Sequence, residues 1–166
     1  GIIIFIKKYK QDEYNHHVLY YRINPRRVLE NHNYIGIFNS KNIDKLIKKF
    51  NILIKTVSPF LPEFDSCNIS RIDYCSNVEL NDQAVIDSYI NLLKRGYFPS
   101  KYTIKKYKNE KSKRNTLSKN GITITGNNGI EVTYYNKYRQ LKEKNPKCRY
   151  IDNSKKIIRI EIRCFK

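Results

Sequence analysis

Two short stretches of the chain repeat one arrangement of charged and hydrophobic residues. They are "RIDYC" (residues 71–75) and "RIEIRC" (residues 159–164), and each places an arginine two positions before a carboxylate, with an isoleucine between them. Because side chains alternate across a β-strand, the arginine and the carboxylate of each stretch would share one face of a sheet. The two strands would therefore each bring one cation and one carboxylate to the same surface.

A third stretch, "IEVTYYNK" (residues 130–137), alternates in the same way. Its hydrophobic set is Ile130, Val132 and Tyr134, and its polar set would lie on the opposite side. If the hydrophobic sets of all three strands rest on helices, the second face of the sheet is left open. That face would carry three carboxylates, four cations and one phenol: Asp73, Glu131, Glu161, Arg71, Lys137, Arg159, Arg163 and Tyr135.

Carboxylates that gather on one face repel one another unless a cation neutralises them, and oxygen ligands of this kind suit Mg²⁺ or Mn²⁺. Asp73, Glu131 and Glu161 are therefore candidate metal ligands. A divalent ion there would polarise a phosphodiester, and Tyr135 beside it could act as the nucleophile. Lys137 would lower the pKa of the phenol or stabilise the pentavalent state, and the three arginines would hold flanking phosphates.

The same alternation has a simpler interpretation. Any sheet with one solvated face alternates charged and hydrophobic residues, and arginine beside glutamate on neighbouring strands is a common cross-strand ion pair. A non-catalytic binding module would use the same face to bind nucleic acid through Tyr20, Tyr135 and the cations. The clustered acids favour the metal site, because a pure binder gains nothing from carboxylates that face a phosphate backbone.

The overall charge favours a polyanionic partner. The chain has 33 Lys and Arg against 15 Asp and Glu, a formal net charge of +18, which is more than solubility requires. The stretch "KKYKNEKSKRN" (residues 105–115) has almost no hydrophobic residue and predicts a basic loop. Within it, Lys111, Lys113 and Arg114 are candidate DNA contacts. Nucleic acid is therefore the expected partner.

Strands are also expected in residues 1–6, as a buried strand, and in "HHVLYYRI" (residues 16–23), which ends before a proline. Hydrophobic residues at helical spacing predict one helix after a cap at Ser40, and a second helix that Asp82 opens and Gly96 ends.

The last part of the chain predicts a hairpin, a polar and helical stretch in "KYRQLKEKN" (residues 137–145), and a final strand. The hairpin turn is expected at "GNNG", residues 126–129. This order predicts a single α+β domain over residues 1–166, with a largely antiparallel sheet, helices packed on one face and an open active face.

The rest of the composition gives expectations about membrane partners, the redox compartment and the extent of the chain. No hydrophobic run approaches the length that crosses a bilayer, so no membrane partner is expected. Four cysteines without paired CxxC spacing favour a reducing cytoplasm. The chain has no methionine and ends on an expected strand, which predicts that it is the core of a longer protein.

The segments "HHVLYYRINPRRVL", "RIDYC", "VTYYNKYRQL" and "IIRIEIRC", in this order, resemble the replication initiation (Rep) proteins of rolling-circle plasmids and of filamentous-type phages. The resemblance covers the chain from His16 to its end. It implies a nicking and joining endonuclease that cuts one DNA strand at a single-stranded or cruciform origin. Such an enzyme stays attached to DNA through a tyrosine and needs a divalent metal.

Carried over residue by residue, the resemblance implies Asp73 and Glu161 as metal ligands and Tyr135 with Lys137 as the active-site pair. Tyr134 is the alternative nucleophile if the register differs by one residue. Two features depart from the family pattern. The histidine pair of many such nucleases is missing, so carboxylates would hold the metal, and "ITITG" (residues 122–126) has no tyrosine before its glycine.

Overall fold

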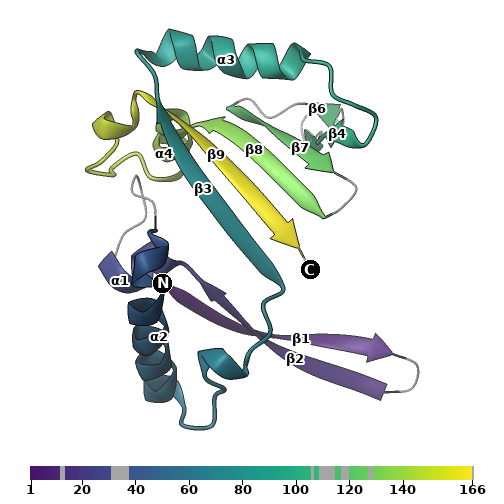
Figure 1. Ribbon diagram of the computed structural model, residues 1–166, viewed down its shortest axis with the longest axis vertical. Coiled ribbons are helices and arrows are strands. Elements are labelled where there is room, and N and C mark those ends of the chain that lie inside the picture. The colour runs from purple at the N-terminus through teal and green to yellow at the C-terminus, as the bar shows by residue number, and fades with distance from the viewer. Residues whose placement is uncertain are drawn as a thin grey trace. The chain divides into compact units, whose positions relative to one another are not determined.

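The computed structural model of the protein (Figure 1) describes most of the chain, namely residues 1–11, 14–30, 38–105, 107–108, 115–116, 120–126 and 129–165. The chain divides into two compact units, Gly1–Asn68 and Ile69–Lys166. Each unit combines helices with an antiparallel sheet, so the predicted α+β class is confirmed. The single domain expected over residues 1–166 stays a prediction.

The first unit begins with a two-stranded ribbon. β1 (Ile2–Gln11) and β2 (Tyr14–Ile23) pair antiparallel along their whole length, which confirms both predicted strands. The burial expected for the start of β1 is wrong, since Ile3 and Ile6 are 55% and 65% exposed. The reason is that β1 and β2 form a two-stranded sheet of their own, which contacts Phe50 through Tyr21 and leaves Ile3 and Ile6 in contact with water.

Two helices complete the first unit. α1 (Pro25–Glu30) starts at a proline, which suits the first position of a helix. α2 (Ile43–Val57) follows a 3-10 turn, Ser40–Asn42. The cap expected at Ser40 is wrong, because the side chain of Asn39 accepts the hydrogen bond from the backbone N–H of Lys41.

The core of the first unit centres on Phe50 of α2, which is fully buried. Its ring packs edge to face with Tyr21 of β2, at a centroid distance of 5.2 Å, and with Phe64, at 5.7 Å. Phe64 begins the 3-10 turn η2 (Phe64–Ser66). Aromatic pairs of this geometry add to the hydrophobic stabilisation of a small core.

The second unit is built on a five-stranded antiparallel sheet with the order β3-β9-β8-β7-β4. Its last strand, β9, lies between the first strand, β3, and β8. The strands are β3 (Arg71–Glu79), β4 (Tyr102–Ile104), β7 (Gly121–Gly126), β8 (Ile130–Asn136) and β9 (Ile157–Phe165). The predicted hairpin is confirmed by the pairing of β7 with β8, and two residues of its expected turn, 127 and 128, lie outside the described residues.

A second small sheet belongs to the same unit. Its strands, β5 (Tyr107–Lys108) and β6 (Asn115–Thr116), pair antiparallel. The basic loop predicted for the stretch of residues 105–115 is therefore wrong at residues 107, 108 and 115, because backbone pairing makes these residues strand. Most of that stretch lies outside the described residues.

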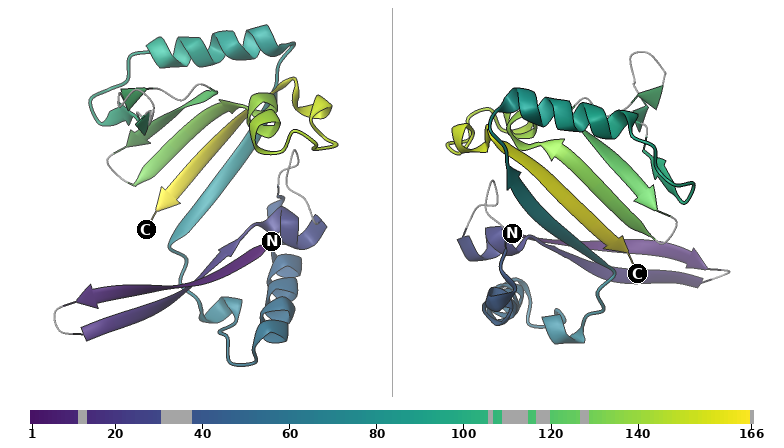
Figure 2. Two further views of the ribbon diagram at one scale, coloured as in Figure 1. Left: turned by 180° about the vertical axis from the view of Figure 1, so that it is seen from behind. Right: turned by 45° about the horizontal axis from the view of Figure 1, so that its top comes forward.

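α3 (Gln83–Arg95) packs on one face of the five-stranded sheet, and Figure 2 shows it near one end of the strands. Its Ile86 and Ile90 are buried against Ile158 of β9, and Leu80 and Tyr134 pack on this cluster. Tyr134 of β8 and Ile158 of β9 therefore face α3, as the alternation predicts, whereas Ile130 and Ile162 on the same sides of these strands are each 39% exposed.

α4 (Lys137–Lys144) follows β8 directly and contacts both β8 and β9. The side chain of Asn136 caps the N-terminus of α4 by accepting a hydrogen bond from the backbone N–H of Arg139. A short turn, η3 (Asp152–Ser154), leads from this region into β9. Among the helices of the described residues, none is long and apolar enough to cross a lipid bilayer.

The start of α3 gives a test of the local structure. Asp82 is its N-cap, and its carboxylate accepts a hydrogen bond from the backbone N–H of Val85 at 2.9 Å. We expect Asp82→Ala to lower the free energy of unfolding by about 1 kcal/mol, because the N–H loses its acceptor. Asp82→Asn is the matched control, since asparagine caps a helix about as well. Circular dichroism during urea unfolding measures both, and equal losses in the two variants would contradict the expectation.

Candidate active site

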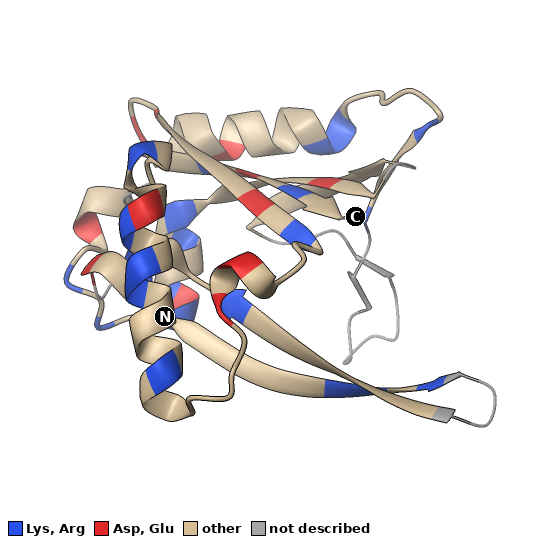
Figure 3. Ribbon diagram, turned by 60° about the horizontal axis from the view of Figure 1, so that its bottom comes forward, with Lys and Arg blue, Asp and Glu red and all other residues tan. Residues whose placement is uncertain are grey.

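The register of three strands gathers the predicted polar residues on the side of the five-stranded sheet opposite to the α3 cluster. We call this side the polar face, and Figure 3 shows its acidic and basic positions along the strands. Three rows of side chains cross it, each taken from β3 through β9 to β8: Asp73, Arg163 and Glu131; Cys75, Glu161 and Thr133; and Asn77, Arg159 and Tyr135.

Arg163 is the centre of the charged cluster on this face. Its guanidinium lies 3.3 Å from Glu131, 3.5 Å from Glu161 and 3.9 Å from Asp73, measured between nitrogen and oxygen atoms. All three predicted carboxylates therefore share one arginine. The side chain of Arg163 is 29% exposed, so its charge is only partly screened by water and stabilises the carboxylates more than a surface arginine would.

Two further cations balance the outer carboxylates. Arg71 forms a two-point ion pair with Asp73, with Nε donating to the carboxylate at 2.6 Å. Lys105 donates to Glu131 at 2.9 Å. The hydrogen bond from Lys105, supported by Arg163, holds the pKa of Glu131 below its ordinary value despite partial burial.

Tyr135 lies at the buried end of the polar face. Its side chain is 9% exposed, and its hydroxyl donates to the carboxylate of Glu161 at 2.6 Å. Burial, followed by the negative charge of Glu161, raises the pKa of the phenol, and Arg159 opposes this shift. The phenol therefore stays protonated at neutral pH unless a neighbour takes its proton, and Glu161 is placed to do so.

Lys137 is buried beside this phenol. It is 4% exposed, its Nζ lies 5.8 Å from the ring centre of Tyr135, and it donates to Gln140 at 2.9 Å. Burial, followed by repulsion from Arg159, lowers the pKa of Lys137 to about 8. A lysine with such a pKa exchanges its proton close to neutral pH, as catalytic lysines do.

The position of Tyr135 depends on the glycine opposite to it. Gly121 of β7 pairs with Tyr135 across the sheet. A Cβ on residue 121 would lie 2.7 Å from the Cβ of Tyr135 and 2.3 Å from the carbonyl oxygen of Tyr134. These distances are shorter than non-bonded contacts allow, so a side chain at this position would push β8 away from β7.

The other predicted residues fall in different places. Arg159 is buried and donates to Asn77 at 2.8 Å, so it belongs to the same cluster as Tyr135. Tyr134 packs against the α3 core on the opposite side of the sheet, so the structure does not bring this alternative nucleophile to the carboxylates. Lys111, Lys113 and Arg114 lie outside the described residues.

The sequence did not single out three polar partners of the site, which are Asn77, Lys105 and Gln140. The two-residue period that places Asp73 on the polar face also places Asn77 there, so that signal was present in the sequence. Lys105 follows the three-residue strand β4, which is too short for its pattern to identify. Gln140 reaches Lys137 from one turn further along α4, and only the helical assignment of this stretch would reveal it.

The carboxylates of the polar face have the ligand chemistry of a divalent-ion site but not its arrangement. Asp73, Glu131 and Glu161 carry oxygen atoms of the kind that Mg²⁺ or Mn²⁺ binds. Within the described residues, however, no group of three His, Cys, Asp or Glu side chains is arranged to hold a metal ion. The space between the three carboxylates holds the guanidinium of Arg163, which an ion would have to displace. The metal site therefore stays a prediction.

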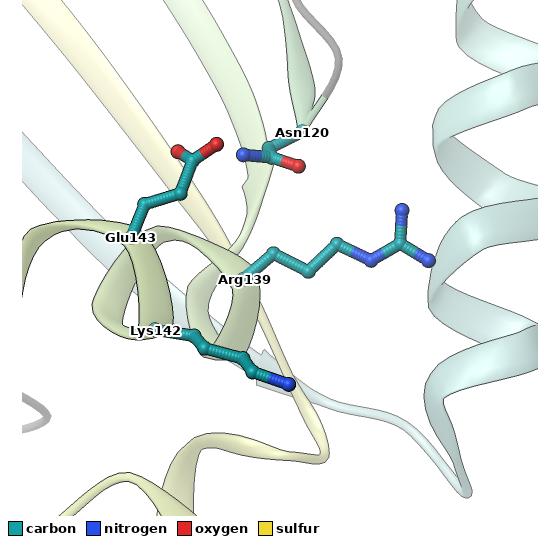
Figure 4. A pocket seen from close by; sticks show the side chains of 4 residues that line it. All are labelled: Asn120, Arg139, Lys142 and Glu143. Atoms are coloured by element: carbon teal, nitrogen blue, oxygen red, sulfur yellow. The ribbon is translucent and has the colours of Figure 1, made fainter. Parts of the chain in front are cut away.

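A shallow pocket of about 510 Å³ lies elsewhere in the second unit, beside α4 (Figure 4). Asn120, Arg139, Lys142 and Glu143 line it, and their charges are mixed. Arg139 forms an ion pair with Asp87 of α3 at 2.5 Å, so its guanidinium ties two helices together. We therefore assign the candidate active site to the polar face and not to this pocket.

Comparison with known proteins adds no relative. No protein-family model, curated protein or solved structure matches the chain.

The buried Lys137 predicts a stability change with a definite pH dependence. Its folded pKa of about 8 lies below its ordinary value of 10.5, so the unfolded chain binds the proton more tightly and the stability of the native protein rises between these two pH values. We expect Lys137→Met to raise the free energy of unfolding at pH 7 by roughly 1 kcal/mol. The stability of this variant should no longer increase between pH 8 and pH 10.5.

Urea unfolding at pH 7, 8, 9 and 10 measures the difference between Lys137→Met and the native protein. Lys142→Met is the matched control, because Lys142 is an exposed lysine of the same helix. A difference that does not shrink as the pH rises would contradict the assignment of a buried, charged lysine.

Replacing Arg163 should change the stability of the protein with the opposite dependence on pH. Its guanidinium stabilises ionised carboxylates, whose pKa in the unfolded chain is about 4. The contribution of Arg163 to the free energy of unfolding is therefore present above this pH. It is lost as the pH falls through the lower pKa that Glu131 has in the folded protein. We expect Arg163→Gln to destabilise the protein by about 1–3 kcal/mol at pH 7 and by much less at pH 3. Thermal unfolding at both pH values measures this, with the exposed Arg95→Gln as the control. A loss that is equal at both pH values would show that Arg163 acts through packing alone.

Proposed function

We propose that the polar face is the active site of a metal-dependent endonuclease that nicks and rejoins one DNA strand at a replication origin, in the manner of rolling-circle initiators, in the cytoplasm. The observation that carries the proposal is the 2.6 Å hydrogen bond from Tyr135 to Glu161, with Lys137 beside the same ring. It joins a phenol, a proton acceptor and a cation in one cluster, on a chain with a net charge of +18.

The proposed step is a transesterification. The phenolic oxygen of Tyr135 attacks the phosphorus of a DNA phosphodiester, and the phenol proton passes to the carboxylate of Glu161. A tyrosine–phosphate ester forms as one P–O bond of the DNA backbone breaks. The departing oxygen takes up a proton and becomes the free hydroxyl of the other strand end. Rejoining is the reverse step, so the ester conserves the energy of the broken bond.

The neighbouring cations fit roles in this step. Lys137, with a pKa of about 8, is suited to give the proton to the departing oxygen, because a general acid works best when its pKa lies near the working pH. Arg159 is near enough to Tyr135 to lower the pKa of the phenol, and its charge would stabilise the negative phosphorus centre. Arg71 and Arg163 are suited to hold flanking phosphates. Mg²⁺ or Mn²⁺, when bound, would supply a Lewis acid for the phosphate oxygens.

A second function is favoured by a specific observation. The carboxylates of the polar face are already neutralised by Arg71, Lys105 and Arg163, and the phenol of Tyr135 is buried. An ion-paired and closed cluster of this kind is also what a sheet needs for stability alone. The alternative is therefore a single-stranded nucleic-acid-binding module of a mobile element that performs no chemistry.

A covalent-adduct assay distinguishes the two functions. The protein is incubated with Mn²⁺ and a labelled pool of random-sequence single-stranded and hairpin-forming DNA, with and without chelator, and is analysed by denaturing gel and peptide mapping. We expect a chelator-sensitive adduct at Tyr135. It should persist in Tyr134→Phe, whose ring faces the α3 core, and disappear in Tyr135→Phe.

Three outcomes would each overturn a part of the proposal. An adduct that survives in Tyr135→Phe, or that maps to another tyrosine, would overturn the assignment of the nucleophile. DNA binding without any adduct would support the binding module. An adduct that forms equally with chelator would remove the metal from the proposal.

A further inference from the structure

One face of the β1–β2 ribbon in the first unit carries aromatic rings and cations side by side. The register pairs Phe5 with Tyr20, and because side chains alternate along each strand, every second residue joins these two on the same face. We call this side the aromatic face. Its described side chains are Ile3, Phe5, Lys7, Tyr9, His16, Val18, Tyr20 and Arg22.

The rings on the aromatic face are fixed in place by one another. Phe5 and Tyr20 are stacked, with ring centres 5.3 Å apart and an angle of 9° between the ring planes. The hydroxyl of Tyr20 is hydrogen bonded to the hydroxyl of Tyr9 at 2.8 Å. Three rings from two strands are therefore held in one arrangement, so that a ligand which stacks on them loses little side-chain entropy from the protein.

Two long cations lie over these rings. The Nζ of Lys7 is 5.2 Å from the ring centre of Tyr20, and the guanidinium carbon of Arg22 is 5.7 Å from that of Phe5. Cations in these positions are held by cation–π attraction, which is weak at an exposed site. They can therefore turn towards a phosphate while the rings stay where they are.

The charge of the ribbon fits an anionic partner. The two strands contain Lys7, Lys8, Lys10 and Arg22 and no acidic residue. The hydrophobic members of the aromatic face remain in contact with water, since Ile3 is 55% exposed and Tyr9 is 43% exposed. Pre-stacked, half-buried rings beside cations match the two parts of a single nucleic-acid strand, its base faces and its phosphates.

We infer that the aromatic face binds single-stranded nucleic acid, with bases stacking on Phe5, Tyr9 and Tyr20 and phosphates contacting Lys7 and Arg22. This surface belongs to the first unit, whereas the polar face belongs to the second unit. The inference rests on the nucleic-acid partner of the proposed function and does not depend on cleavage. A duplex keeps its bases stacked on one another, so it should bind here only through its phosphates.

Single tryptophans provide the first test, because the native chain has no tryptophan. Phe5→Trp places the reporter on the aromatic face. Ile6→Trp is the matched control, since Ile6 is the next residue, is 65% exposed and lies on the opposite face of the ribbon. We expect an oligothymidylate to quench the fluorescence of the Phe5→Trp protein strongly and that of the Ile6→Trp protein weakly. Equal quenching, or quenching in the control alone, would overturn the inference.

Affinity measurements provide the second test. Tyr20→Leu removes a stacking ring, together with the hydroxyl that is hydrogen bonded to Tyr9, while leaving the charge of the position unchanged. We expect it to weaken oligothymidylate binding about tenfold without changing the salt dependence, and to leave duplex binding unaffected. Lys7→Gln should instead reduce the salt dependence for both forms of DNA. Circular dichroism confirms that each variant retains its fold. Unchanged affinity in Tyr20→Leu, or equal losses for single strand and duplex, would overturn stacking on this face.

The two proposals fail in distinguishable ways. Oligothymidylate that quenches Phe5→Trp when no covalent adduct forms would sustain the aromatic face and reject the nuclease. A Tyr135 adduct with no quenching at Phe5→Trp would sustain the nuclease and reject the aromatic face. Anionic phospholipid vesicles that shift the fluorescence of Phe5→Trp, where oligothymidylate does not, would assign this face to a lipid surface instead.

Discussion

The two-residue period of β9 is the constraint on which the second unit depends. Ile158 packs against α3 on one side of this strand, while Arg159 and Arg163 serve the polar face on the other. A shift of one residue in register would turn the charged side chains towards α3 and the isoleucines away from it. The register of β9 therefore specifies the hydrophobic core and the candidate site together, and a change in register would disrupt both.

The sequence was sufficient for those features that follow from local alternation. It predicted which residues of β3, β8 and β9 share the polar face, and it predicted the pairing of β7 with β8. It did not predict that Arg163 would lie between three carboxylates, because the partner of a long, flexible cation depends on strands far apart in the chain. It also did not predict the burial of Tyr135 and Lys137, which depends on how α4 lies against β8 and β9.

The buried end of the polar face holds two groups with shifted pKa values, Tyr135 and Lys137. Burying Lys137 next to Arg159 costs free energy, as the lowered pKa of the lysine shows, and a hydrophobic residue of similar length would fit with less cost. Groups with strongly shifted pKa values in one cluster are typical of sites selected for chemistry or binding. The outer end, where Arg71 and Lys105 balance Asp73 and Glu131, has the simpler character of a cross-strand ion-pair network.

The central claim is that nucleic acid engages the polar face of the sheet and not its α3 side. NMR of the protein with ¹³C-labelled tyrosine rings, titrated with a single-stranded oligonucleotide, tests it directly, because Tyr135 and Tyr134 are adjacent in β8 and lie on opposite faces. Signals of the two rings are assigned from their loss in Tyr135→Phe and Tyr134→Phe. The account predicts that the Tyr135 signal shifts on binding and the Tyr134 signal does not. A Tyr135 signal that stays unchanged at saturating oligonucleotide would contradict it.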